Sequence, residues 1–299
     1  MAKARAAKPA LPPRFQKPLI LIFGLAVFFA AVLALGKYTR EGIRDSDRFA
    51  AVFTQVDCSP PPNQSVAEFL AEVQYLSELP DRLPILDKDL PDNLAAAFRR
   101  HPWVLKVEGV TVLPSRRLEV RLKFRRPVLE VFTTGRVVQD SSADETNAGT
   151  SGTLDVKSWF VDGAGIVLPR RKGFEQLPKL HTTSLPTQGS GNSWGNGGVE
   201  AAARLADFLR NHQGTLHIEE YQVNSTDLIL LTSSGSRVEW GHAPGLEESD
   251  EAKAERKLER ILHYCRNHSS IDLPNPPRLH DLRPLEASIH TGIIGPVKK

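Results

Sequence analysis

The sequence predicts an α+β protein in which one membrane-spanning helix precedes two folded units. Residues 18–36 form an uncharged apolar run, and a helix–helix–strand–strand succession lies between residues 65 and 125. From residue 128 onward, short apolar strands alternate with two amphipathic helices, which is typical of an antiparallel sheet with helices packed on it. A chain of 299 residues, with 40% hydrophobic and 24% charged residues, is long enough for two globular units.

The apolar run reads PLILIFGLAVFFAAVLALG, and as a helix it would span roughly 28 Å, the thickness of one bilayer core. A cleaved secretory signal is the alternative, although such signals have apolar cores of only about 7–15 residues. We expect a retained anchor, with residues 1–17 as a basic cytoplasmic tail and the folded units outside the cytoplasm. Residues 37–47 would then form a juxtamembrane linker.

The first folded unit, residues 48–127, is predicted to have the order β-α-α-β-β. Residues 48–56 read as a strand. Ser65, with Glu68 three residues later, forms the capping box of a helix over residues 65–76. A second helix over residues 90–101 has a proline in its first turn, and Pro102 ends it.

Two strands close this unit. In the first, Trp103, Leu105 and Val107 are expected on one face, and a change of parity at Glu108–Gly109 predicts a bulge. In the second, apolar residues alternate strictly with charged ones, which predicts a strand with one buried and one solvated face. The inward positions are Leu118, Val120, Leu122 and Phe124.

A basic stretch covers the end of the second helix and both strands. Its cationic residues are Arg99, Arg100, Lys106, Arg116, Arg117, Arg121, Lys123, Arg125 and Arg126. A nucleic-acid surface would need aromatic residues on the exposed face, but here they lie on the apolar faces, and the net charge is only +3. We therefore expect no nucleic-acid partner. A contact with anionic lipid headgroups remains an alternative to a plain solvated face.

The second unit, residues 128–290, is predicted as a mainly antiparallel sheet with helices, and residues 291–299 as a C-terminal tail. Residues 139–153 and 183–198 are polar and read as loops. The predicted elements are a strand at 128–133, a strand–turn–strand at 159–170, a helix at 199–212 stopped by Gly214, strands at 216–223, 227–232 and 236–241, a helix at 247–267 and a strand at 278–283.

No catalytic, cofactor-binding or metal-binding pattern is present in the sequence. His101, His212 and His268 lie near predicted helix C-termini, where a cation interacts favourably with the helix dipole. Asp162 and Gly165 are the residue types that a tight turn requires. We expect no enzymatic activity, no cofactor and no small-molecule substrate.

The two cysteines, Cys58 and Cys265, are far apart and form no C-x-x-C pattern. Cys265 falls on the apolar face of its predicted helix, which favours a buried free thiol. A disulfide between the two is the alternative if the folded units lie in an oxidising compartment.

A β-α-α-β-β unit directly after one membrane span resembles a POTRA domain, and the chain is similar to the FtsQ/DivIB family of bacterial cell division proteins. The matching positions follow the family's order and cover roughly residues 45–290. They are His101, Pro102, Trp103, Val104, Pro114, Arg126 and Pro127, then Val161, Asp162, Gly165 and Val167, the QLPKL segment at 176–180, VEWG at 238–241 with Lys257 and Leu258, and LHDLR at 279–283.

This resemblance implies a non-enzymatic scaffold of the divisome, anchored in the cell inner membrane and located at the division septum. It also implies partners, namely bitopic proteins of the FtsB/FtsL type, which add a strand to the last edge of the sheet. The residues expected at that edge are Asp281, Leu282, Arg283, Leu285, Ala287 and Ile289. The chain departs from the family at Pro284, where a tyrosine is common and where proline removes a backbone donor.

Two other functions remain open at this point. One is a POTRA-type module for outer-membrane protein assembly or secretion, although such proteins usually carry tandem repeats or a barrel. The other is a membrane-anchored hydrolase whose catalytic residues are scattered along the chain. The absence of a catalytic motif argues against it.

Overall fold

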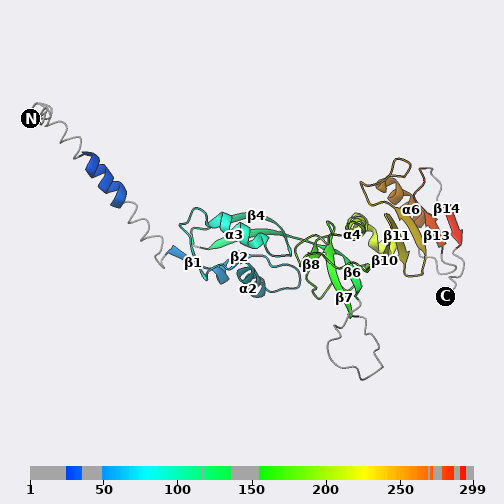
Figure 1. The fold of residues 1–299 in the computed structure, drawn as a ribbon, viewed down its shortest axis with the longest axis horizontal. Helices are drawn as coiled ribbons and strands as arrows, with labels where there is room; N and C mark the ends of the chain where they lie inside the picture. Colours follow the sequence, from blue (N-terminus) through cyan, green and yellow to red (C-terminus); the bar gives the residue numbers. More distant parts are fainter. Residues whose placement is uncertain are drawn as a thin grey trace, which may run out of the picture.

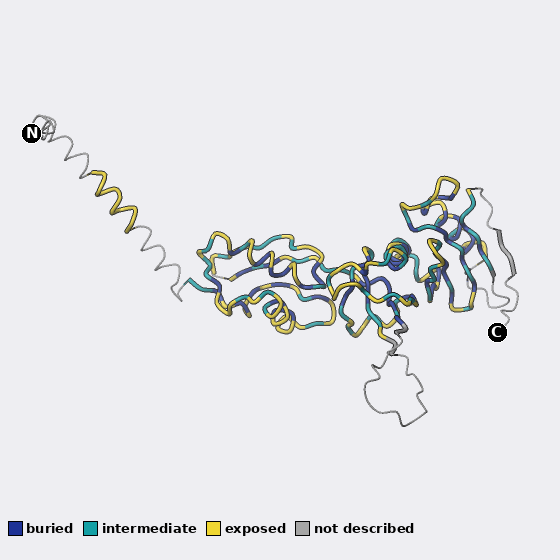
Figure 2. The backbone as a smooth tube through the Cα atoms, in the orientation of Figure 1, coloured by how far each residue is buried: buried dark blue, intermediate teal, exposed yellow. Residues whose placement is uncertain are grey.

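The computed structural model describes residues 25–35, 49–115, 117–135, 155–268, 270–271, 278–285 and 290–293. They form a mixed α+β protein with one two-stranded, one three-stranded and one nine-stranded sheet. Figure 1 shows the smaller sheets with helices α2 and α3 at one end of the folded part, and the strands β6 to β14 extending away from them. Figure 2 marks the buried residues of both parts in dark blue.

The predicted membrane span lies only partly within the described residues. Residues 25–35 are helical, and their side chains are exposed. Within the described ranges, no helix is both long enough and apolar enough to cross a membrane. The remaining residues of the predicted span, the tail 1–17 and the linker 37–47 lie outside the described residues, as does the polar segment 139–153.

The chain enters the first unit through two short strands, and the single strand predicted over residues 48–56 is wrong. Strand β1 (Ala50–Val52) pairs with β3 (Arg82–Pro84), whereas β2 (Asp57–Cys58) joins a different sheet by pairing with β5 (Leu118–Phe124). Between them, the 3-10 turn η2 (Phe53–Gln55) buries Phe53 in the core. The turn redirects the chain from the two-stranded sheet to the three-stranded sheet.

Helices α2 (Val66–Ser77) and α3 (Leu90–Arg99) pack on the three-stranded sheet β2-β5-β4. The predicted capping box is confirmed, because Ser65 Oγ accepts a hydrogen bond from Glu68 N while the Glu68 carboxylate accepts one from Ser65 N. The proline predicted in the first turn of α3 is also confirmed. The apolar faces of both helices meet β4 (Val104–Val112) and β5 in one core. The helix residues of this core are Phe69, Leu70, Val73, Leu90, Leu94, Ala97 and Phe98.

The predicted bulge in β4 is confirmed by a register shift between Val107 and Gly109 against β5. A second shift, between Val104 and Lys106, was not predicted. It reverses the parity at the start of the strand, so that Val104 is buried and Leu105 is 47% exposed. The prediction that Leu105 faces inward beside Trp103 is therefore wrong.

The nine-stranded sheet has the order β14-β13-β12-β11-β10-β9-β6-β7-β8. It is antiparallel except for the parallel pairs β12–β13, β9–β10 and β6–β9. Its strands are β6 (Pro127–Gly135), β7 (Asp155–Asp162), β8 (Val167–Leu168), β9 (Lys179–Thr182), β10 (Ile218–Asn224), β11 (Asp227–Thr232), β12 (Arg237–Gly241), β13 (Arg278–Asp281) and β14 (His290–Ile293). The short β9 is absent from the elements predicted above.

Helices α4 (Gly197–Leu209) and α6 (Ala254–His268) contribute to one core with the strands of this sheet. Two of their predicted limits are wrong. Gly214 does not stop α4, because the 3-10 turn η3 (Arg210–His212) and α5 (Gln213–Leu216) continue the chain to His217, which adopts a left-handed conformation. Helix α6 begins at residue 254 and not at residue 247, because residues 247–252 form a loop that contacts the C-terminal segment.

Candidate partner-binding site

The predicted partner-binding residues lie at the C-terminal end of the large sheet. Strand β13 runs between β12, with which it is parallel, and β14, with which it is antiparallel. Strand β14 is the terminal strand of the sheet on this side. Of the six predicted residues, Asp281, Leu282, Arg283 and Leu285 are described, whereas Ala287 and Ile289 lie outside the described residues.

Leu282 belongs to the core and not to the surface. Its side chain is fully buried in the cluster formed with α6 and β12. Its backbone N–H donates to Glu239 O at 3.1 Å. The structure therefore places Leu282 where it holds β13 against β12, out of reach of a partner side chain.

Arg283 forms ion pairs with carboxylates of three strands, β11, β12 and β13. Its guanidinium bonds Asp281 Oδ2 at 2.9 Å, Asp227 Oδ2 at 3.4 Å and the Glu239 carboxylate. The hydrogen bond with Asp281 and the charges of all three carboxylates raise the pKa of Arg283 against the opposing effect of burial. The Arg283 side chain is 41% exposed, so solvent screens these ion pairs and we expect them to contribute little to the stability of the fold.

The buried Arg260 of α6 holds the segment that follows β13. Its Nη1 donates to Pro284 O at 2.6 Å, and its Nη2 donates to Leu285 O at 2.8 Å. Burial lowers the pKa of Arg260. Because the helix satisfies these carbonyls, residues 284 and 285 lie beside α6. The exposed Leu285 is therefore the one described member of the predicted set with an apolar side chain open to solvent.

Glu251 is the buried centre of the loop beside this segment. Its Oε1 accepts from His242 N at 2.9 Å and from Lys257 Nζ, and its Oε2 contacts His242 Nδ1 at 2.8 Å. Ala252 N also donates to Arg283 O, which joins the loop to the C-terminal segment. Burial raises the pKa of Glu251, but the hydrogen bonds from Lys257 and His242 hold it below its usual value.

Lys257, one of the positions on which the resemblance to the FtsQ/DivIB family rests, pairs with Glu251 inside the protein. Its side chain is fully buried, and its ammonium lies 5.4 Å from the centroid of the Trp240 ring. Burial lowers its pKa, against the effect of Glu251. Sequence reasoning missed Glu251 and Arg260, because neither follows a motif and only the folded chain brings them to the segment 282–285.

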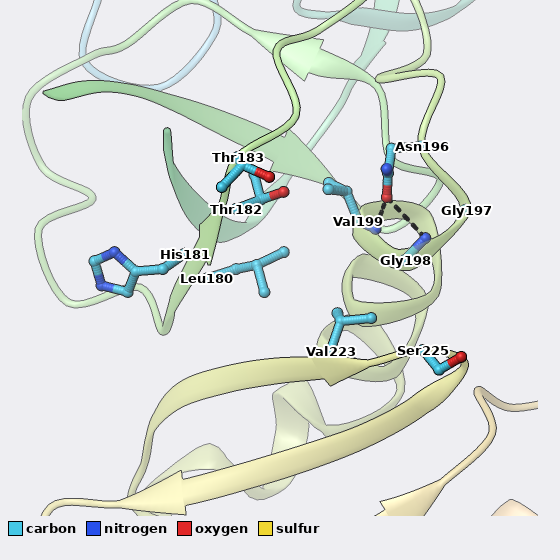
Figure 3. A pocket seen from close by; sticks show the side chains of 10 residues that line it. All are labelled: Leu180, His181, Thr182, Thr183, Asn196, Gly197, Gly198, Val199, Val223 and Ser225. Carbon is cyan, nitrogen blue, oxygen red and sulfur yellow. Dashed lines mark hydrogen bonds between the residues drawn. The ribbon is translucent and has the colours of Figure 1, made fainter. Parts of the chain in front are cut away.

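Several surface cavities lie along the large sheet. One of about 340 Å³ is lined by Asp227, His242, Glu248, Asp250, Glu251, Asp281, Arg283 and Pro284. A second, of about 520 Å³, is lined by residues of β6, β7 and β9 and of the loop between β8 and β9. A third, of about 580 Å³, lies at the start of α4 (Figure 3). There Asn196 Oδ1 accepts from Gly198 N at 3.0 Å and from Val199 N at 3.2 Å, so the first amides of the helix already have an acceptor. Within the described ranges, no three His, Cys, Asp or Glu side chains are placed to hold a metal ion.

The remaining residues singled out in the sequence, Asp162, His268 and His101, make hydrogen bonds to the backbone. The carboxylate of Asp162 accepts from Ala164 N at 3.0 Å and Ile166 N at 2.9 Å, as expected of a turn aspartate. The prediction for His268 is consistent with its Nδ1 lying 3.1 Å from Tyr264 O in the last turn of α6. His101 lies just past the end of α3, as expected, but its ring is buried and its Nδ1 accepts a hydrogen bond from Trp103 N.

Both cysteines are free and buried, which confirms the free thiol expected at Cys265 and excludes the alternative of a disulfide in this structure. They lie in different cores. Burial, with a smaller contribution from Asp57, raises the pKa of Cys58 to about 11. Such a thiol is poorly reactive at neutral pH.

A comparison with models of known protein families and with curated proteins finds no match to this chain.

Proposed function

We propose that this chain is a non-enzymatic, single-span scaffold of the bacterial division machinery. In this proposal residues 18–36 anchor it in the inner membrane, residues 48–127 act as a POTRA-like unit, and the second unit, from residue 128 to the end of β14, acts as a β domain of the FtsQ type. Residues 291–293, which the sequence assigns to the C-terminal tail, belong to this sheet because they pair with β13. The proposed partners are bitopic proteins of the FtsB/FtsL type. The support is the resemblance of the sequence, together with the order β2-α2-β3-α3-β4-β5 ahead of a large sheet rich in antiparallel pairs.

The observation that carries the proposed binding mode is the position of β14. It is the terminal strand of the nine-stranded sheet, and it pairs with β13 over four residues. A terminal strand can accept a further strand from a partner through its outward backbone groups. Pro284 has no backbone N–H, but it lies outside β14, in the segment held by Arg260. The backbone N–H groups of β14 that a partner strand would bond are therefore unaffected by this proline.

Localisation in dividing cells tests the biological part of the proposal. A fluorescent fusion of the full chain is expected at the septum, and purification from membranes is expected to retain a bitopic septal protein. A uniform envelope signal without such a partner would contradict the proposal. Extraction of membranes at high pH tests the anchor, because the full chain should stay with the membranes and a chain lacking residues 1–47 should not.

Proline substitution tests the edge. Neighbouring residues of an edge strand point their N–H groups in opposite directions, so Thr291→Pro and Gly292→Pro affect different sides of β14. One variant should lose partner capture with an unchanged thermal unfolding transition, and the other should weaken the β13–β14 pairing as well. Gln188→Pro, in an exposed loop, is the matched control. Capture at wild-type level by both edge variants would exclude β14 as the docking strand.

A further inference from the structure

A loop of the second unit, residues 169–178 between β8 and β9, contacts the first unit around Trp103. The Arg171 guanidinium carbon lies 4.8 Å from the centroid of the Trp103 ring, and the Phe174 ring stacks on the same indole at 5.7 Å. Asn63 Nδ2 also donates to Lys172 O at 2.9 Å. Trp103 is fully buried in a small core with Phe160 and Leu168 of the second unit, and this loop covers it.

The position of Trp103 depends on the neighbouring histidine. Trp103 N lies 3.3 Å from His101 Nδ1, and a backbone N–H can only donate, so Nδ1 carries no proton. The other ring nitrogen, Nε2, then carries the proton and donates to Glu72 Oε2 at 2.8 Å. The geometry thus fixes His101 as a neutral imidazole of one tautomer.

The same carboxylate oxygen faces the loop. Glu72 Oε2 lies 3.4 Å from Arg171 Nη2, so the carboxylate joins the imidazole of the first unit to the guanidinium of the second. These contacts form a closed ring of four residues, in which Trp103 takes part through its backbone N–H and its indole. The ring consists of His101, Glu72, Arg171 and Trp103, and we call it the junction ring.

The charges around His101 favour its neutral form. Burial lowers the pKa of His101 below the ordinary 6.5, the contact with Glu72 raises it, and the charge of Arg171 lowers it. For Glu72, burial raises the pKa, but hydrogen bonds from His101 and Gln64 and the charge of Arg171 hold it below its usual value. Glu68, one turn earlier on α2, interacts with both Glu72 and Arg171.

We propose that the junction ring is an acid-sensitive latch between the two units. A proton added at His101 Nδ1 turns this acceptor into a donor. The protonated Nδ1–H and the Trp103 N–H then face each other and repel. Trp103 then loses the position on which Arg171 and Phe174 stack, and the loop 169–178 is released. The released form binds a proton that the closed form excludes, so acidification below the ordinary histidine value of about 6.5 favours release.

Energy transfer across the junction in the full-length chain tests this proposal. Labels can be placed at Tyr75→Cys on α2, which is 85% exposed in the native protein, and at Leu246→Cys in the second unit, which is 56% exposed. The native cysteines are buried and should not react. We expect the transfer efficiency to change as the pH falls from about 8 to about 5, while far-ultraviolet circular dichroism stays constant.

Two variants test whether the change in transfer efficiency arises from His101 and Arg171. In His101→Asn, the amide oxygen replaces Nδ1 as the acceptor and cannot titrate, so transfer should no longer change as the pH falls. Arg171→Met should give the released value already at neutral pH. Arg170→Met is the matched control, because Arg170 pairs with Glu130 within the second unit, 2.9 Å away, and should behave like the wild type.

A constant transfer efficiency in the wild type, or an unchanged pH response in His101→Asn, would overturn the latch. So would a change that coincides with loss of circular dichroism. Nitrogen chemical shifts of the His101 ring give an independent reading that needs no variant. They should report an unprotonated Nδ1 at neutral pH, and a protonated Nδ1 there would also refute the proposal.

Discussion

Arg125 Nη1 donates to Asp162 Oδ2 at 2.7 Å, and this ion pair joins the end of β5 in the first unit to the β7–β8 turn of the second. Both side chains are largely buried. The sequence places Arg125 on a solvated face with Arg121 and Lys123. That placement agrees with the structure for Arg121 and Lys123, which are exposed, and is wrong for Arg125.

Arg125→Met should destabilise the protein, because it leaves one oxygen of the Asp162 carboxylate without its charged donor. A hydrogen bond to a charged group contributes about 1.5–3 kcal/mol, so the free energy of unfolding should fall by about that amount. Arg126→Met, at the exposed neighbouring position, is the control and should change it by less than about 0.5 kcal/mol. Chemical denaturation measures both. Equal effects of the two substitutions would mean that the ion pair does not contribute to the free energy of unfolding.

Lys257→Met should cost more, because it leaves the Glu251 carboxylate buried without a cation. Breaking one partner of a buried pair typically costs about 3–5 kcal/mol. Lys253→Met removes an exposed cation that lies 3.6 Å from Glu247 and should cost little. Thermal unfolding of the two variants compares them directly, and similar transition temperatures would contradict the structural role of Lys257.

Gly241→Ala should be poorly tolerated for two reasons. Gly241 has φ +85°, and a Cβ there would lie 2.0 Å from Glu251 Oε1. Gly245→Ala separates the two causes, because Gly245 has φ +82° but open space around a Cβ. The left-handed conformation alone costs roughly 1–2 kcal/mol. Gly241→Ala should exceed that cost in a denaturation experiment, and a loss no larger than that of Gly245→Ala would show that Glu251 moves aside freely.

Acid should weaken the protein partly through Glu251. Because the pKa of Glu251 in the folded state is below its ordinary 4.5, its contribution to stability is present above that pH and is lost as the pH falls through the lowered value. Glu251→Gln cannot titrate, so its free energy of unfolding should depend less steeply on pH below about 4.5. Denaturation at several acidic pH values measures the slope. A slope identical to that of the wild type would exclude Glu251 as a contributor.

The thiols should react only after unfolding. The pKa of Cys58 is raised to about 11 and both cysteines are buried, so a thiol reagent at neutral pH should modify neither in the native chain. Tyr75→Cys adds an exposed thiol and should react at once, which controls for the reagent. In denaturant, both native cysteines should react. Rapid modification under native conditions would mean that one of the two cores opens locally.

Local patterns in the sequence predicted local structure well. Ser65 and Glu68 set the start of α2, because a capping box needs only one turn of chain to satisfy its donors. The parity change at Gly109 marked a bulge in β4 for a similar reason, since side-chain alternation is a property of the strand itself. The turn at Asp162 and the buried thiol of Cys265 follow from the same kind of short-range signal.

The sequence by itself determined the α+β class, most helices and strands, and the apolar faces that form the cores, because periodicity is written within each element. Only the tertiary structure decided that Arg260 holds Pro284 and Leu285, that Glu251 pairs with Lys257, and that His101 contacts Glu72 of α2. These contacts join residues from separate elements, and the charge state of a buried side chain depends on the partners that folding brings to it. The position of β14 at the end of the sheet is likewise a property of the assembled strands.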